Sequence, residues 1–355
     1  MTRLADVTGL DRVGIPVWQA VRPWSKSVSV HQGKGLDAEV AQLGACMEAV
    51  ECHHAENWTG EIRAAEFAKL PKVERLPALD DCARVRGVVG DDPIAWTRAE
   101  RIGCDSGLWV PAAAVGLDAC RARPWWIDCS SNGQGAGFDT DYASCKGLFE
   151  VIERDAYHSW LATSFVDRGR DGVAATSIRF EWFRTIDERL RALHIRIRLF
   201  ALPAVVLVPV FVAEIIDLGP ESRSLPFAHG ICAHADAETA LKGAIAEAAQ
   251  SRLAEIAGAR DDLELERPQI AGPRAGLALP MPRTVALQEF DRRFPARPAP
   301  TPTLVFAAAV EALSDAGYPV VGRIRLSPPC CQVTTIKMFV PGLAGRDRVR
   351  RGPVA

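Results

Sequence analysis

The sequence lacks the features that mark exported, membrane-spanning or disulfide-framed proteins. Residues 1–16 carry charges and no apolar segment, so no secretory signal is expected. The ten cysteines include no Cys-x-x-Cys pair, which argues against a zinc ribbon and predicts reduced thiols in a cytoplasmic protein. The most apolar run, residues 199–216, contains Pro203, Pro209 and Glu214. It therefore predicts buried strands and not a membrane span.

Two common nucleotide-binding motifs are also missing. No GxxxxGK[ST] sequence is present, and no GxGxxG lies between a predicted strand and helix, so neither a Walker A site nor a Rossmann cofactor is expected. The net charge of −2 gives no reason to expect nucleic acid or an anionic membrane as a partner. With 48% hydrophobic and 24% charged residues, the 355 residues read as an ordinary globular protein. No domain boundary is visible, so residues 1–355 are expected to form a single domain.

The sequence does contain one pattern three times: an Asp, a predicted helix, and two acid or amide side chains three residues apart. The members are Asp37, Ala41, Glu48 and Glu51; Asp139, Ala143, Glu150 and Glu153; and Asp236, Ala240, Glu247 and Gln250. Residues three apart share one side of a helix. Mg²⁺ binds carboxylate oxygens and commonly shares them with substrate phosphates. The pattern therefore predicts an acidic site built from three helices, although single Glu pairs also occur on solvated helix faces.

Glycines precede two of these helices. Gly33 and Gly35 stand before the first, and Gly135 and Gly137 stand before the second. Glycine in a turn lets backbone N–H groups approach an anion at a helix N-terminus. Lys34 would add a positive charge on a phosphate. The glycines are therefore interpreted as phosphate-binding turns, with a plain tight turn as the alternative.

The alternation of helical and strand-like segments predicts an α+β fold with a mixed β-sheet. Helices are expected over 37–58, 139–161, 179–193, 236–256 and 304–316, and strands over 28–30, 125–128, 194–200, 205–216, 319–326 and 333–340. Turns or loops are expected at 32–35, 130–137 and 227–230. The quasi-repeated units lie near 28–60, 125–161 and 227–262, followed by a Pro/Arg-rich loop or lid over 263–303 and a C-terminal α/β piece over 304–343.

Three segments together resemble the YcaO family: SVSVHQGKGLDAEVAQLGACMEAVECHHAE, CSSNGQGAGFDTDYASCKGLFEVIERDA and AHADAETALKGAIAEAAQSRLAEIAGARDD. The later GYPVVGRIRL and FVPGL segments are similar to it as well, so the resemblance covers most of the chain. It implies a YcaO-like fold in which acidic helices line a site for ATP and Mg²⁺. It also implies phosphorylation of a backbone amide oxygen in a ribosomally made peptide. A nucleophile would then convert that amide to an azoline, a thioamide or an amidine.

The resemblance also assigns roles to individual positions. The implied metal ligands are Glu48, Glu51, Glu150, Glu153 and Glu247. The implied nucleotide-binding residues are Lys34, Gly35, Asn132, Ser144, Glu48 and Arg252. The implied catalytic residues are Glu153, Arg154 and Gln250.

The chain departs from the family pattern at several points. Gly44 and Cys52 stand where the family often has a serine and a basic residue. The proline-rich end of azoline-forming members is missing, and no leader-binding domain is expected. The CHHAE and GARDD variants look closest to members that work with a TfuA-like partner, for which thioamide formation is expected. An azoline-forming enzyme, a degenerate docking partner, an ATP-dependent enzyme for another target and a homodimer all remain open.

The remaining polar and aromatic residues are mostly interpreted as structural. His53, His54, His229 and His234 are expected in structural or solvated positions, while His158 is a candidate base. Trp125 and Trp126 are expected in the core.

Overall fold

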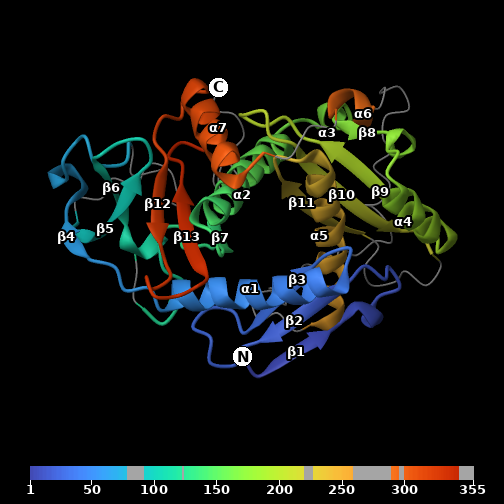
Figure 1. Ribbon diagram of the computed structural model, residues 1–355, viewed down its shortest axis with the longest axis horizontal. Coiled ribbons are helices and arrows are strands. Elements are labelled where there is room, and N and C mark those ends of the chain that lie inside the picture. The colour runs from blue at the N-terminus through green and yellow to red at the C-terminus, as the bar shows by residue number, and fades with distance from the viewer. Residues whose placement is uncertain (78–91, 122–123, 220–226, 259–288, 296–299, 344–355) are drawn as a thin grey trace.

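Three antiparallel sheets organise the computed structural model, which describes residues 1–77, 92–121, 124–219, 227–258, 289–295 and 300–343 (Figure 1). The first sheet contains β1 (Arg3–Asp6), β2 (Val17–Val21) and β3 (Val30–Lys34). The second has the order β11 (Phe227–Ala233), β10 (Val210–Asp217), β9 (Ile195–Ala201) and β8 (Gly172–Val173). The third has the order β4 (Arg63–Ala65), β5 (Ile94–Arg101), β12 (Gly322–Arg325), β13 (Thr334–Phe339) and β7 (Gln134–Gly137), with β6 (Gly107–Pro111) beside β5. The expected single mixed sheet is therefore replaced by several antiparallel ones.

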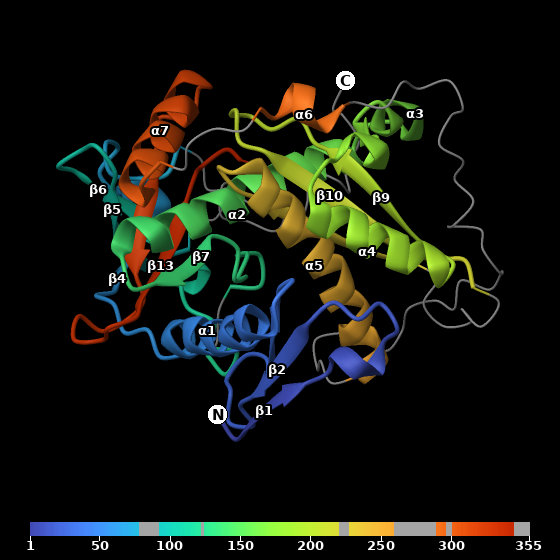
Figure 2. The same ribbon diagram turned by 45° about the vertical axis from the view of Figure 1, so that its right-hand side comes forward.

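Each long helix covers a different sheet. α1 (Ala38–Glu56) follows β3 and packs on β2 and β3, α2 (Thr140–Leu161) follows β7 and packs on β7 and β13, and α5 (Ala237–Ala257) follows β11 and packs on β10 and β11. Figure 2 shows the three helices in the middle of the molecule, with the sheets arranged around them. The three sequence repeats are thus three strand–helix units.

The units also contact one another in a cycle. α1 contacts β7 of the second unit, α2 contacts β11 of the third unit, and α5 contacts β3 of the first unit. Each acid-bearing helix therefore lies against its own strand and against the strand of the next unit. This arrangement brings the three helices together although their sequences are far apart.

An aspartate begins each of the three helices, as the sequence predicted. The Asp37 side chain accepts from the backbone N–H groups of Glu39 and Val40, and the Asp139 side chain accepts from that of Tyr142. Asp236 accepts from Thr239 N in the same way. Such capping satisfies backbone donors that have no partner within the helix.

The predicted glycine turns are wrong, because three of the four glycines lie in strands and Gly35 directly follows one. Gly33 is in β3, Gly135 is in β7, and the expected loop 227–230 is the start of β11. A Cβ on Gly33 would lie 1.9 Å from the Ala41 carbonyl oxygen, and one on Gly135 would lie 2.2 Å from that of Ala143. The glycines let each helix approach its strand backbone to backbone, a separation at which no side chain fits.

One predicted strand and one predicted core residue are also wrong. Residues 125–128 form a turn with an isolated bridge position, and not a strand. The Trp125 side chain is 75% exposed, whereas Trp126 packs on the core around β5 and β6. The two tryptophans are neighbours in the sequence, but one is exposed to solvent and the other packs against the core.

The apolar segment before α5 forms buried strands, as predicted. β9 and β10 pair in antiparallel register, and every residue of β10 is buried. β10 begins at Val210, so the preceding Pro209 does not interrupt its hydrogen bonds. No helix in the described ranges is long and apolar enough to cross a membrane.

The remaining elements frame this arrangement. The short helices are α3 (Phe165–Gly169), α4 (Glu181–Ala192), α6 (Phe290–Arg293), α7 (Pro302–Asp315), and the 3-10 turns η1 (Thr8–Leu10), η2 (Phe67–Lys69), η4 (Ala112–Ala114) and η5 (Ala175–Ser177). The predicted helices at 179–193 and 304–316 correspond to α4 and α7. The predicted loop 263–303 contains α6, but 259–288 and 296–299 lie outside the described residues. Residues 260–262 of the GARDD segment therefore also lie outside them.

Candidate active site

The first acid of two helices accepts a hydrogen bond from a backbone N–H in, or directly before, the strand of its own unit. A carboxylate oxygen of Glu48 accepts from Gln32 N at 2.8 Å, and one of Glu150 accepts from Gly133 N at 3.1 Å. A charged acceptor makes such a bond stronger than a neutral one. These bonds fix both side chains beside the strands of their units. Gly33 and Gly135 let these strands lie close to the helices.

The second member of each pair reaches the next unit. Glu153 Oε2 accepts from Ala233 N of β11 at 3.0 Å, and Gln250 Nε2 lies 3.5 Å from the carbonyl oxygen of Gln32 in β3. Glu51 Oε1 lies 3.1 Å from Lys146 Nζ on α2. The predicted convergence of three helices is therefore present: the pairs follow the same cycle as the backbone contacts.

Basic side chains lie against the glutamates. Lys34 forms an ion pair with Glu247, across from β3 to α5. Arg154 lies 3.6 Å from a Glu150 oxygen and 3.8 Å from a Glu153 oxygen. Among the described residues, no group of three or more His, Cys, Asp or Glu side chains is arranged to hold a metal ion. Binding a metal here therefore requires the basic side chains and the carboxylates to rearrange.

The charges shift the proton affinities of the site. Burial raises the pKa of Glu153 to about 8, and the charge of Glu247 adds to this shift. Burial also raises the pKa of Glu150. Burial alone would raise the pKa of Glu247, but the positive charges of Lys34 and Arg154 lower it below its usual range. A divalent cation would favour the ionised form of all three carboxyl groups.

The residues present fit ATP and Mg²⁺. The site offers several carboxylate oxygens, the ligands that Mg²⁺ prefers, together with cations for phosphate. The Asn132 Oδ1 atom and both amide atoms of Gln32 are buried, and none of these three atoms has a hydrogen-bond partner among the described residues. Buried polar atoms without partners are rare in native structures, so each of these side chains is a candidate for a ligand contact. Asn132 as a nucleotide contact remains a prediction.

Three predicted nucleotide contacts make hydrogen bonds within the protein, and their role at the nucleotide stays a prediction. Ser144 is fully buried, donates to the Thr140 carbonyl oxygen at 2.7 Å and accepts from Arg323 at 3.2 Å. Arg252 is 4% exposed and contacts both Asp11 oxygens, at 2.7 and 3.1 Å.

Gly35 is the third of these positions. Its N–H donates to the Pro16 carbonyl oxygen at 3.3 Å, so it does not form the expected phosphate-binding turn. A Cβ at Gly35 would lie 2.9 Å from a Val40 methyl group, which gives the glycine a packing role. Gly35, Ser144 and Arg252 thus contact the elements around the site, and their contact with a nucleotide stays a prediction.

The histidines largely have the structural roles expected of them. His229 lies 2.9 Å from the Tyr157 hydroxyl, and His234 accepts from Asp236 N at 3.0 Å near the start of α5. His54 contacts Thr335 at 2.8 Å, and His53 is exposed. His158 as a base stays a prediction.

Sequence reasoning missed two residues of this region. Lys146 is one, because its contact with Glu51 joins two helices that are distant in sequence. Glu56 is the other: it is 1% exposed, and Arg22, Ser25 and Ser27 donate to its carboxylate. No spacing in the sequence signals either contact.

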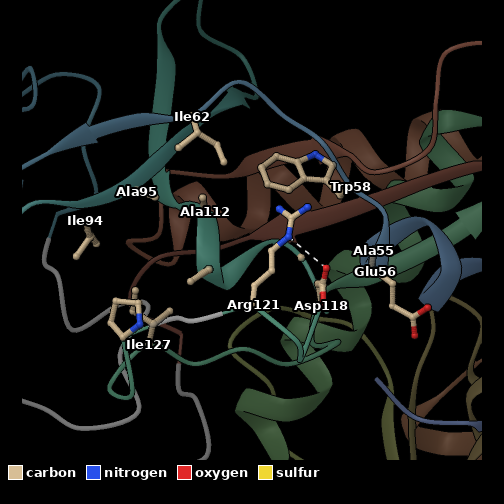
Figure 3. Close-up of a pocket in the computed structure, with 13 residues that line it drawn as sticks. Ala55, Glu56, Trp58, Ile62, Ile94, Ala95, Ala112, Asp118, Arg121 and Ile127 are labelled. Atoms are coloured by element: carbon tan, nitrogen blue, oxygen red, sulfur yellow. Dashed lines mark ion pairs between the residues drawn. The ribbon is translucent and has the colours of Figure 1, made fainter. Parts of the chain in front are cut away.

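A separate apolar cavity of about 190 Å³ lies beyond the C-terminal end of α1 (Figure 3). Trp58, Ile62 and Ile127 line it, and the ion pair of Arg121 with Asp118 lies at its side. Glu56 lines it, but none of the glutamates predicted to bind metal does. It is smaller than the roughly 300 Å³ at which ligand pockets usually begin.

A family model described as YcaO cyclodehydratase, ATP- and Mg²⁺-binding, matches residues 32–344. The chain belongs to the YcaO family. As a YcaO protein it is an ATP- and Mg²⁺-dependent enzyme, which agrees with the donor set of the three-helix site.

Curated relatives support the same assignment. This YcaO chain is 31% identical to an uncharacterized protein in the tfuA 3' region of Rhizobium leguminosarum bv. trifolii, over 97% of this chain and 83% of that protein. It is 30% identical to the uncharacterized protein Rv1375 of Mycobacterium tuberculosis, over 97% of this chain and 77% of that protein.

Solved structures share the fold. YcaO from Methanopyrus kandleri, bound with AMPPCP and Mg²⁺, matches with a TM-score of 0.69 and 22% identity, over 100% of this chain and 89% of that one. A heterocyclase in complex with substrate and cofactor matches with a TM-score of 0.78 and 19% identity. The match covers 97% of this chain, which spans 50% of that heterocyclase.

Proposed function

We propose that this YcaO enzyme uses ATP and Mg²⁺ to phosphorylate a backbone amide oxygen in a ribosomally made peptide, and that the product is a thioamide. The observation that carries the first part is the cycle of acid pairs from α1, α2 and α5, with Lys34 and Arg154 against them. When bound, ATP supplies the phosphoryl group and Mg²⁺ neutralises its phosphates.

The chain's own residues would divide the work as follows. Glu48, Glu51, Glu150, Glu153 and Glu247 would hold the metal. Lys34 and Arg154 would place positive charge where negative charge develops on the phosphates. Gln250, which contacts Gln32 of the next unit, would hold the third helix in register with the first. Backbone N–H groups donate to Glu150 and Glu153 in the absence of a ligand, so a bound metal would have to share or replace these bonds.

The thioamide rests on a narrower observation. A relative with 31% identity is described by its position beside tfuA, and a TfuA-like partner protein is proposed for this chain on that ground. The nucleophile would then be sulfide or a sulfur carrier. Attack of sulfide on the phosphorylated amide carbon and the loss of phosphate would exchange oxygen for sulfur. With a sulfur carrier as the nucleophile, the bond between the sulfur and the carrier would also have to break.

An azoline is the second candidate, because the matching family model is described as a cyclodehydratase. In that case a Cys, Ser or Thr side chain of the peptide itself would attack, and the peptide would lose water. Mass spectrometry of a treated peptide separates the two products: sulfur-for-oxygen exchange adds mass, and cyclodehydration removes the mass of one water.

The first test measures nucleotide binding. Calorimetry with the non-hydrolysable analogue AMPPCP, with and without Mg²⁺, would compare the wild type with the double variant Glu150→Gln/Glu153→Gln. Gln keeps an acceptor for Gly133 N and Ala233 N and removes only the charge. Mg²⁺-dependent binding that the double variant loses supports the proposal. Binding that survives in it would place the nucleotide elsewhere. Glu188→Gln, on the exposed face of α4, is the matched control.

A further inference from the structure

Lys146 crosses from α2 to α1 and contacts a glutamate that no other basic side chain is seen to contact in the described part of the chain. Its Nζ lies 3.1 Å from Glu51 Oε1. The Lys146 side chain is 44% exposed and that of Glu51 is 15% exposed. The equivalent positions of the other two units are Gly44 and Gly243, so the repeat pattern gave no reason to single out Lys146.

The contact between Lys146 and Glu51 is one of several between a basic side chain and a glutamate of the three helices. Lys34 lies against Glu247 of α5, and Arg154 lies against Glu150 and Glu153 of α2. Lys146 lies against Glu51 of α1. Each of the three acid-bearing helices therefore has a basic side chain at one of its glutamates, and two of these basic side chains come from another unit.

We infer that Lys146 belongs to the metal and nucleotide site: it neutralises Glu51 until Mg²⁺ takes that carboxylate, and its ammonium then serves a nucleotide phosphate. The inference rests on the proposed function. An ammonium and a divalent cation cannot share one carboxylate without like-charge repulsion, so Mg²⁺ binding displaces the lysine. The lysine stem is flexible and its side chain is nearly half exposed, so the ammonium can move without disturbing the core.

Two opposite effects follow for Lys146→Met, which keeps most of the apolar stem. Mg²⁺ alone should bind about tenfold more tightly, because its competitor for Glu51 is gone. AMPPCP with Mg²⁺ should bind about tenfold more weakly, because one charge-assisted contact to phosphate is lost. A lysine that only braces two helices would change the thermal midpoint and neither affinity.

The experiment measures both quantities. The thermal midpoint is followed as Mg²⁺ is added without nucleotide, and calorimetry measures AMPPCP binding with Mg²⁺. The variants are Lys146→Met, Lys146→Arg, which should restore AMPPCP binding in part, and Lys242→Met. Lys242 is a matched control, because it is 41% exposed and pairs with Glu238 on its own helix.

The outcomes are distinct. Tighter Mg²⁺ binding together with weaker AMPPCP binding, in Lys146→Met only, supports the inference. Three outcomes overturn the inference and leave the proposed function unaffected. They are a Lys146→Met variant with unchanged properties, a lower thermal midpoint with both affinities unchanged, and a change in only one of the two affinities. A wild type that does not bind AMPPCP overturns the proposed function, and the role of Lys146 with it.

Discussion

Glu153 on α2 accepts a hydrogen bond at 3.0 Å from the backbone N–H of Ala233, in a strand of the next unit. The same carboxyl group lies beside Arg154 and is 8% exposed. One residue therefore joins two sheets and takes part in the acidic site. Stability and ligand binding should be coupled through it.

The pH dependence of stability should show this coupling. The pKa of Glu153 is raised to about 8, against an ordinary value of about 4.3, so the folded state keeps a proton that the unfolded state loses between these values. In the absence of Mg²⁺, the free energy of unfolding should therefore gain from Glu153 at low pH and lose that gain as pH rises from about 4 to about 8. Urea unfolding across this range measures the slope.

Glu153→Gln should flatten that slope, whereas Glu188→Gln should keep it. A second readout is proton release: Mg²⁺ binding at pH 7 should expel a proton from Glu153, since metal ligands must be ionised. Calorimetry in buffers of different ionisation enthalpy detects it. The same number of released protons in wild type and Glu153→Gln would contradict this assignment.

Gly33→Ala should destabilise the fold strongly. A Cβ there would lie 1.9 Å from the Ala41 carbonyl oxygen, and neither backbone can move without shifting β3 or α1. We expect a loss of about 3 kcal/mol or more, at the upper end for overpacked cores. Gly9→Ala is the control, because nothing lies within 4 Å of a Cβ at that position. Equal midpoints of urea unfolding for the two variants would disprove the close helix–strand approach.

Asp11→Asn should reveal whether Arg252 serves the frame or the nucleotide. The Arg252–Asp11 pair is buried on both sides, so removing one charge should cost about 3 kcal/mol of unfolding free energy. Asp187→Asn disrupts a more exposed pair with Arg191 and should cost less than about 1 kcal/mol. Chemical denaturation measures both. If Asp11→Asn instead lowers the affinity for AMPPCP and leaves the stability unchanged, Arg252 is assigned to the nucleotide site.

Asn132→Ala should weaken AMPPCP binding about tenfold with little change in the thermal midpoint. The Asn132 Oδ1 atom is buried without a partner in the described residues, so the contact that this variant removes is one with a bound ligand. Asn57→Ala provides the contrast, because Asn57 donates to the His53 carbonyl oxygen at the end of α1. That variant should lose about 1 kcal/mol of stability and keep its affinity. The reverse result would assign Asn132 to the frame.

Much of the site was readable from the sequence because its signals are local. Asp37, Asp139 and Asp236 cap helices whose residues follow directly, and a spacing of three places both acids on one helix side. The family resemblance then named the ligands that such acids hold. The buried strands β9 and β10 were readable for the same reason, since β9 alternates apolar and basic residues before an apolar segment and β10 is almost wholly apolar.

What the sequence could not determine depends on contacts between distant segments. Glycine is compatible both with a turn and with a helix packed closely on a strand. The sequence alone does not distinguish these two roles for Gly33 and Gly135, whereas the packing of α1 and α2 on their strands does. The contacts of Ser144 with Arg323 and of Arg252 with Asp11 join segments far apart in the chain, so no spacing in the sequence indicates them.

Three capped helices that carry acids in register follow from local sequence signals. The packing of the sheets sets two further contacts: the second acid of one helix reaches the strand of the next unit, as Glu153 reaches Ala233, and Lys146 lies at Glu51. The physical reason is that capping and periodicity act within one or two helical turns, whereas the pairing of charges from different sheets is fixed by how those sheets pack.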